Sequence, residues 1–170
     1  ALTSLKSRDF KSAASQFENT GDETLKPYIT ACNELVGDYA ERRLPGKKLL
    51  RLLALLNNDL YTAVIEEILR KESKYLSYDE KKRLCKEVLD LMNPESSIKY
   101  NVNQFLGKVY ITLKDSTGLR YISALSLFSA SVIDVSNTGV MEIDSLVSMP
   151  ITNLNISNTR IEDLSPVKDS

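Results

Sequence analysis

The sequence predicts an α+β protein, in which an all-helical domain precedes a short solenoid of repeated coils with a parallel β-sheet. Up to Asn93, apolar residues recur at spacings of three and four. After Pro94, Lys and Glu give way to Ser, Thr, Asn, Val and Ile, and apolar residues alternate. We therefore expect a helical domain at 1–93, a linker or cap at 94–104, and three coils of 21–22 residues at 105–170.

Five helices are expected in the first 93 residues. The first covers about 2–18 with a break at 7–9, and its apolar face consists of Phe10, Ala13, Ala14 and Phe17. Thr20 and Glu23 have the spacing of a capping box ahead of the second helix. That helix ends at 44–46, and its apolar face consists of Tyr28, Cys32, Leu35, Val36 and Tyr39.

The third expected helix, at 49–56, is apolar on all sides and is therefore predicted to lie in the core. Residues 57–59 break it and cap a fourth helix at 60–71, whose polar side carries Glu66, Glu67 and Arg70. Ser77 and Glu80 form a second capping-box pattern at the start of the fifth helix, which ends at 93–94.

An internal repeat is the strongest signal in the sequence. A step of 21 residues places Leu154 on Ile133 and Ile156 on Val135, and it superimposes the identical triplets 157–159 and 136–138, Ser-Asn-Thr. Another step of 21 reaches Gly118 and its neighbours, whereas the strand part of that first copy needs a step of 22. One coil cannot bury its apolar side alone, so the coils are expected to stack and their strands to pair in parallel.

These coils resemble leucine-rich repeats, whose pattern L-x-x-L-x-L-x-x-N is matched from Ile151 to Thr159 and from Ala130 to Thr138. Thr117, Thr138 and Thr159 occupy the asparagine position, and the resemblance implies that they bond backbone groups of adjacent coils as structural turn residues. The style of the last coil is similar to repeats in multidomain bacterial proteins, including Ser/Thr protein kinases. The resemblance covers about 65 residues.

Residues 9–17 resemble the entry of the second helix of a tetratricopeptide repeat, with an aromatic, a small residue and an aromatic at spacings of three and four. The Pro expected after that helix is absent, and no 34-residue period is found. A helical bundle of another kind remains the alternative for this half.

Composition excludes several classes of function. Without His there is no Ser-His or Cys-His pair and no His-ligated zinc, and the six glycines lie at least nine residues apart, so no glycine-rich phosphate loop exists. A net charge of −1 gives no general attraction for nucleic acid, and no apolar run reaches the length of a membrane span. We therefore predict a protein that is not an enzyme and holds no cofactor or metal. We also expect that it does not bind nucleic acid and has no membrane-spanning segment.

The remaining charged clusters are interpreted as solvated surface. The pairs Glu66-Glu67 and Asp22-Glu23 lie on a polar helix face or at a helix start, and the basic clusters at 41–43, 47–48 and 81–83 leave no excess of positive charge. Cys32 and Cys85 are expected to be packed free thiols, which favours a reducing compartment and thus the cytoplasm.

The candidate partner-binding residues are those whose side chains point away from the core on each strand, into the concave face of the solenoid. They are Tyr110 and Thr112, Val132 and Asp134, and Asn153 and Asn155. Simple solubility of an exposed sheet face is an equal alternative, because three coils barely supply the roughly 800 Å² per partner that a stable interface needs.

The first functional hypothesis is a non-catalytic scaffold that binds a protein partner through the concave strand face or the helical groove. The second is a regulatory or sensor region of a larger bacterial signalling enzyme such as a Ser/Thr kinase. The chain begins without Met and ends three residues after Val167 without a capping helix. We therefore expect an excised or processed piece whose repeats continue in the parent, or whose uncapped end self-associates or meets a partner chain.

Overall fold

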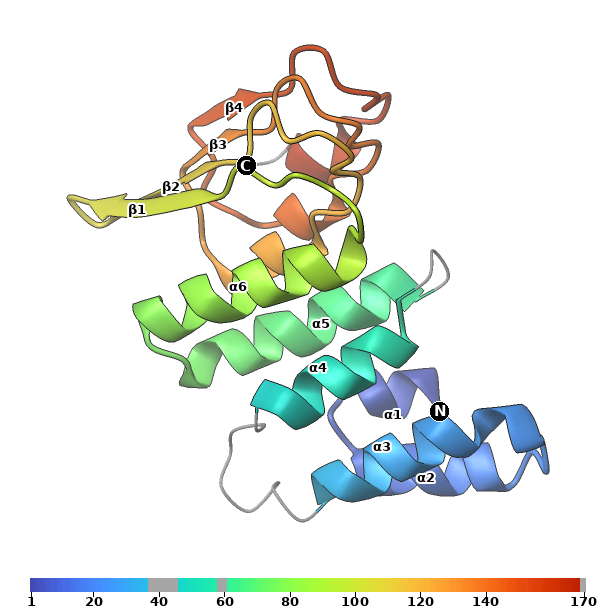
Figure 1. Ribbon diagram of the computed structural model, residues 1–170. Coiled ribbons are helices and arrows are strands. Elements are labelled where there is room, and N and C mark those ends of the chain that lie inside the picture. The colour runs from blue at the N-terminus through green and yellow to red at the C-terminus, as the bar shows by residue number, and fades with distance from the viewer. Residues whose placement is uncertain (37–45, 58–60, 169–170) are drawn as a thin grey trace. The chain divides into compact units, whose positions relative to one another are not determined.

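The computed structural model describes residues 1–36, 46–57 and 61–168, which form two compact packing units (Figure 1). The first unit comprises Ala1–Leu76 and is helical; the second comprises Ser77–Ser170 and contains the sheet. The protein is thus a mixed helical and sheet protein, as an α+β class requires.

The helical unit contains α1 (Leu2–Lys6), α2 (Phe10–Glu18), α3 (Lys26–Val36), α4 (Gly46–Leu55) and α5 (Thr62–Glu72), with short 3-10 helices at Glu23–Leu25 and Ser73–Tyr75. In this unit α2 packs on α3, α3 on α4, and α1 on both α2 and α5. The prediction that the leucines of α4 lie in the core is confirmed in part: Leu49, Leu52 and Leu53 are fully buried, whereas Leu50 and Leu55 are half-buried.

The chain breaks between α1 and α2 where the sequence predicts it. Arg8 has a φ of +62°, and the Asp9 carboxylate accepts a 3.0 Å hydrogen bond from the Ser12 amide as the N-cap of α2. The face predicted for α2 is buried. The predicted capping box at Thr20 and Glu23 is wrong, because Asp22 is the N-cap and accepts from the Thr24 amide at 2.9 Å.

The two neighbouring glutamates of α5, both expected on the surface, differ in burial. Glu66 is buried rather than solvated, because α5 turns it toward the interior together with Ile65 and Ile68. Glu67 lies on the partly exposed side and pairs with Arg70 and Lys71 at 3.0 and 3.3 Å. Several expectations concern positions outside the described residues: Tyr39, the helix end at 44–46 except Gly46, the basic cluster at 41–43, residues 58–60 and Ser170.

The coil unit begins with α6 (Tyr78–Met92), where the predicted capping box is confirmed: Ser77 accepts from the Glu80 amide while the Glu80 side chain accepts from the Ser77 amide. A four-stranded sheet follows in the order β1 (Asn101–Phe105), β2 (Lys108–Thr112), β3 (Val132–Asp134) and β4 (Asn153–Asn155). Strands β2, β3 and β4 are parallel, as predicted, but β1 is antiparallel to β2, so the sheet is mixed.

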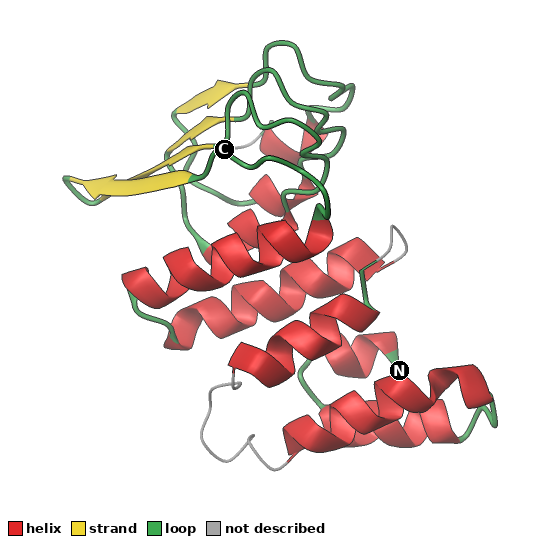
Figure 2. Ribbon diagram, viewed as in Figure 1, coloured by secondary structure: helices red, strands yellow, loops and turns green. Residues whose placement is uncertain are grey.

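The strand offsets follow the sequence repeat. Tyr110 is paired with Val132, and Val132 with Asn153, which are steps of 22 and 21 residues. The chain returns through 3-10 helices at Ser123–Leu127, Asp144–Leu146 and Ser165–Val167, which start 21 residues apart. Figure 2 shows the strands on one side of this unit and the return segments on the other. Between them lies the core, which includes Ile111, Ile133, Val135, Val140, Ile143 and Leu146.

The packing boundary and the composition boundary differ. The sequence changes character at Pro94, but α6 packs on the return segment Ser123–Leu127 and belongs to the coil unit. Asn93, at the end of α6, explains the attachment. Its side chain accepts from the amides of Arg120 and Tyr121 at 2.8 and 2.9 Å, and it donates to the Leu89 and Tyr121 carbonyls, both at 2.9 Å.

The expected linker at 94–104 is also part of this unit. Its last residues form β1, and Lys99 and Ser97 donate backbone hydrogen bonds to the Ser116 hydroxyl and the Thr117 carbonyl, both at 2.9 Å. Among the described residues, no helix has the length and apolar character needed to cross a membrane.

Candidate functional site

The candidate site is the exposed sheet face, defined here as the side of β1–β4 that points away from the core. Strand pairing arranges its side chains in two rows across the sheet. One row consists of Asn101, Thr112, Asp134 and Asn155, and the other of Asn103, Tyr110, Val132 and Asn153. The opposite side of the same strands carries Val102, Ile111, Ile133 and Leu154, of which the first three are buried.

All six residues predicted for partner binding lie on this face, in register. Thr112, Asn153 and Asn155 are exposed, whereas Tyr110, Val132 and Asp134 are half-buried. Asn101 and Asn103 extend the rows, and they were not predicted because the segment before Phe105 was interpreted as a linker. The alternation Asn101-Val102-Asn103 ahead of a Leu-Gly turn is the signal that could have found them.

Two members of the first row also stabilise their own coils. The Asp134 carboxylate accepts from the Ser136 amide and hydroxyl at 2.9 and 2.6 Å. The Asn155 side-chain oxygen accepts from the Ser157 amide and hydroxyl at 3.2 and 2.8 Å. Burial raises the pKa of Asp134, but the bonds from Ser136 and Asn155 and the charge of Lys114 outweigh it, so this pKa lies below its ordinary value.

Threonine hydroxyls stabilise the turns of the second and third coils. The hydroxyls of Thr138 and Thr159 donate to the Val135 and Ile156 carbonyls of their own coils at 2.6 and 2.7 Å. Thr117 lies at the equivalent turn of the first coil, where its carbonyl accepts from Ser97 at 2.9 Å. These hydroxyl bonds of Thr138 and Thr159 are thus within a coil, unlike those implied by the leucine-rich-repeat resemblance.

The side-chain bonds that join the turns of adjacent coils come from Asn137 and Asn158, one residue before the threonines. Asn137 donates to the Asp115 carboxylate at 2.6 Å, and Asn158 donates to the Asn137 side-chain oxygen at 2.8 Å. All three residues have positive φ values, of +58°, +56° and +54° in chain order. Asn and Asp tolerate this conformation better than other residues with a Cβ atom, which explains why they occur at this position of each coil.

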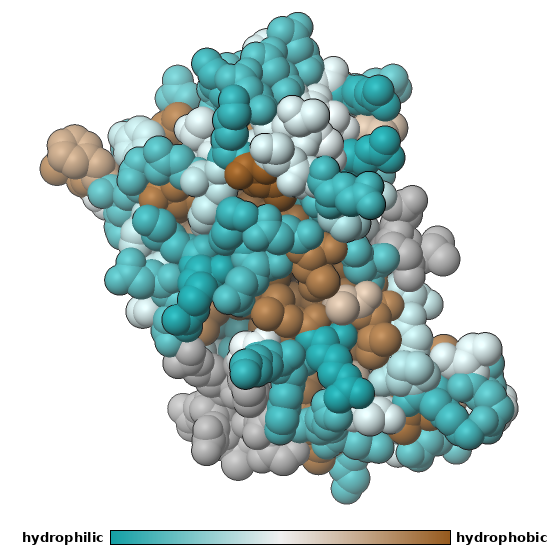
Figure 3. Space-filling view, viewed as in Figure 1, coloured by the Kyte–Doolittle hydropathy of each residue, from teal (hydrophilic) through white to brown (hydrophobic). Residues whose placement is uncertain are grey.

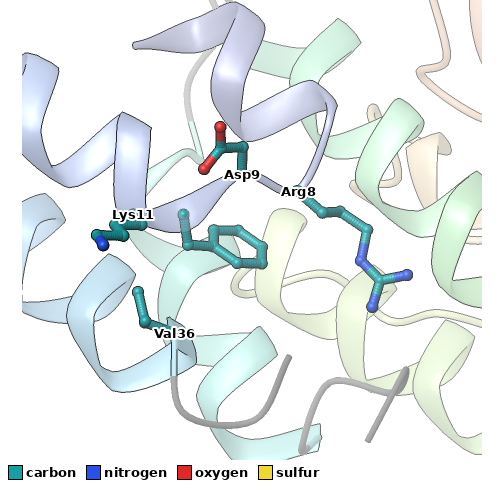
Figure 4. Close-up of a pocket in the computed structure, with 5 residues that line it drawn as sticks. Arg8, Asp9, Lys11 and Val36 are labelled. Atoms are coloured by element: carbon teal, nitrogen blue, oxygen red, sulfur yellow. The ribbon is translucent and has the colours of Figure 1, made fainter. Parts of the chain in front are cut away.

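The helical unit holds a pocket lined by Arg8, Asp9, Phe10, Lys11 and Val36 (Figure 4). Its polar groups already have structural roles. Asp9 caps α2, and hydrogen bonds from Ser12 lower the pKa of its carboxyl. The Arg8 side chain extends away from Lys11 and Asp9 and pairs with Glu72 at 3.2 Å. The described residues that line this pocket therefore form no constellation of groups that suggests a reaction.

The described residues contain no group of three or more His, Cys, Asp or Glu side chains placed to hold a metal ion. Both cysteines are free and buried, and burial raises the pKa of Cys32 to about 11 and that of Cys85 to about 12. These thiols are protonated at neutral pH and are poor nucleophiles.

Comparison with protein-family models, with curated proteins and with solved structures finds no match to this chain. Any functional inference therefore depends on the chemistry of the exposed sheet face and its surroundings.

Proposed function

We propose that the chain is a non-catalytic protein-interaction module that binds its partner on the exposed sheet face. The observation that carries this proposal is the pair of register-matched rows, which a continuous backbone ladder holds at fixed spacing. A rigid array of side chains loses little conformational entropy when a partner binds, so it suits recognition.

The chemistry of the face favours a protein partner. Its eight side chains include five amide or hydroxyl groups on Asn101, Asn103, Thr112, Asn153 and Asn155, together with one aromatic, one aliphatic and one carboxylate. Amides and hydroxyls both donate and accept hydrogen bonds, as a peptide backbone or a polar protein surface requires. Polyanionic nucleic acid would instead need an excess of Lys and Arg.

We also propose that the coils form a leucine-rich-repeat-like solenoid and that the helical unit contains a tetratricopeptide-like helix pair. Strand steps of 21 and 22 residues, return helices at matching positions, and turn residues with matching φ values support a leucine-rich-repeat-like solenoid. For the helical unit, the packing of α1 on α2 and the burial of Phe10, Ala13 and Phe17 support a tetratricopeptide-like pair with α2 as its second helix.

The test uses a double variant that changes the face without disturbing the turn bonds of Asp134 and Asn155. Thr112→Arg with Asn153→Arg places two long cations on exposed positions in different rows. Met141→Arg with Val147→Arg is the matched control, because it adds the same charge at positions that are 56% and 41% exposed in the return segments. Circular dichroism establishes that both variants fold.

A photo-crosslinking amino acid at Asn103 of the full chain is used to identify the partner, and its affinity for the purified variants is then measured by calorimetry. We expect the face variant to weaken binding by at least about 1.4 kcal/mol, or tenfold, and the control to bind like the parent. Equal affinities of the face variant and the parent would reject this surface.

A further inference from the structure

The hairpin formed by β1 and β2 ends in two apolar side chains that do not belong to the core. Phe105 is 65% exposed and Leu106 is 85% exposed, the two largest values among the exposed large hydrophobic residues of the described chain. The hairpin projects beyond the neighbouring strands, because β3 pairs only with Tyr110–Thr112 of β2 (Figure 1). In Figure 3 this projection is coloured as apolar.

The turn residue is an unfavourable choice for folding alone. Pairing of Phe105 with Lys108 leaves a two-residue loop, Leu106-Gly107, with φ values of +48° and +76°. Positive φ at both positions is the signature of a type I′ turn, whose first position favours Asn, Asp or Gly. Leu106 is the only apolar residue among the described non-glycine residues with positive φ. An outlier of this kind points to a role outside the fold.

The charges near the tip suit an anionic surface. Lys108 is exposed beside Phe105, and no acidic residue occurs between Ser96 and Lys114 of the chain. The segments 128–131 and 149–152 lead into β3 and β4 at the end of the sheet where β2 begins, and they contain no charged residue. Asp134, the carboxylate of the exposed sheet face, pairs with Thr112 at the opposite end of β2.

We propose that this hairpin tip inserts into the interfacial region of a phospholipid bilayer, with Phe105 and Leu106 among the upper acyl chains and Lys108 at the anionic headgroups. Two side chains supply far less than the roughly 800 Å² per partner of a stable protein interface. A bilayer interface requires no minimum contact area, and each buried apolar group adds to partitioning. The contact is peripheral, reversible and independent of the protein-binding role of the exposed sheet face.

The chain contains no Trp, so a single introduced indole reports its own surroundings without background. Phe105→Trp of the full chain is titrated with vesicles of phosphatidylcholine and phosphatidylserine. We expect a blue shift of its emission and quenching by lipids brominated in the acyl chain. Met141→Trp is the matched control, since Met141 is 56% exposed in the same unit but outside the hairpin. Its emission is expected to stay unchanged.

Leu106→Asn separates insertion from folding. Asn-Gly is the preferred sequence of a type I′ turn, so this change keeps or raises the melting temperature while it removes one of the two apolar side chains of the tip. In the Phe105→Trp background we expect the partition coefficient to fall by at least about tenfold. Lys108→Gln lowers it by about fivefold and removes most of its dependence on phosphatidylserine.

Three outcomes would overturn the proposal: no spectral shift at saturating lipid, equal shifts from the two Trp positions, or a partition coefficient that Leu106→Asn does not change. A blue shift that depends on protein concentration without vesicles would assign the tip to self-association instead. None of these variants changes a residue of the two rows of the exposed sheet face, because Phe105 and Lys108 pair beyond the ends of the rows. Failure here therefore leaves the protein-binding proposal intact.

Discussion

The helical unit and the coil unit dispose of their polar groups in different ways. In the helical unit, the Arg8 and Glu72 side chains form an ion pair at 3.2 Å while only 8% and 1% exposed. The Arg8 guanidinium also lies 5.3 Å from the centre of the Tyr75 ring. This is a single arrangement that links the α1–α2 junction to the end of α5, and nothing in the described chain repeats it.

In the coil unit, equivalent polar residues of successive coils form the same hydrogen bonds. Asp134 and Asn155 bind the serines two residues on, Thr138 and Thr159 bind the carbonyls three residues back, and Asn137 and Asn158 continue one ladder. The difference has a consequence for stability. Each repeated, partly exposed bond contributes little to the free energy of unfolding, so its removal should cost little. Removal of one partner of a buried ion pair should cost much more.

The largest effect is expected when the buried pair of the helical unit is broken. Glu72→Gln removes the carboxylate that pairs with the buried Arg8 guanidinium, which should lower the free energy of unfolding by about 3–5 kcal/mol. Hydrogen exchange with mass spectrometry, read in peptides from 1–76, measures the loss in the unit concerned. The double variant Arg8→Met with Glu72→Leu should recover most of it. Equal losses in the single and double variants would show that packing, not charge, is responsible.

A smaller effect is expected at Asn93, a buried polar residue of the coil unit whose bonds, like the buried pair, are not repeated. Asn93→Ala leaves the Arg120 and Tyr121 amides without the acceptor that they share, at about 1–3 kcal/mol for an unsatisfied buried group. Urea denaturation gives the total loss, and exchange in peptides from 77–128 should rise most. Ser96→Ala, which removes a single partly buried hydroxyl that bonds the Asn93 carbonyl, is the control and should cost about 1 kcal/mol or less.

Asn137 tests the repeated bonds. Asn137→Ala removes two ladder bonds and puts Ala, which tolerates positive φ less well than Asn, at a φ of +56°, for an expected loss of about 1–2 kcal/mol. Asn137→Gly removes the same bonds but accepts the backbone conformation, so its loss should be below about 1 kcal/mol. Thermal unfolding of the two variants separates backbone strain from the ladder. A glycine variant that is as unstable as the alanine variant would assign the effect to the ladder alone.

The repeated half was predicted from sequence in more detail than the helical half, for a physical reason. Burial of Ile133 and Val135 is repeated at a fixed step, so the inward side of each strand and the position of its turn can be read from one chain. Helical periodicity likewise predicted the buried face of α2. It failed at Glu66, because periodicity gives the face of a residue but does not reveal what packs against a carboxylate.

Three features could not be predicted because they depend on contacts between distant segments. Asn93 was interpreted only as a helix stop, although its partners lie 27 and 28 residues further along the chain. The strand β1 follows no repeat, and its antiparallel pairing is set by the turn at Leu106-Gly107. The inter-coil bonds of Asn137 were attributed to the neighbouring threonines, since the repeat aligns the whole Ser-Asn-Thr triplet and does not say which side chain reaches the next coil.

The smallest effect is expected at Asp134, where the second coil has a carboxylate and the third has Asn155 in the same role. Asp134→Asn keeps an oxygen for the Ser136 amide, so the free energy of unfolding at neutral pH should change by less than about 1 kcal/mol. Its signature is the pH dependence. The pKa of Asp134 is lowered in the folded state, so its ionised form stabilises the fold above the ordinary pKa of about 3.9.

That contribution is lost as the pH falls from about 5 through the folded pKa, because the unfolded state binds the proton first. Urea denaturation between about pH 5 and pH 2 should therefore show a shallower decline for Asp134→Asn than for the parent. The comparison must be made between the two proteins, since Asp9, Asp22, Glu67 and Asp163 also have lowered pKa values and are common to both. Parallel curves would mean that the coil depends on an oxygen acceptor at this position and not on its charge, so that the coils with Asp134 and Asn155 are equivalent.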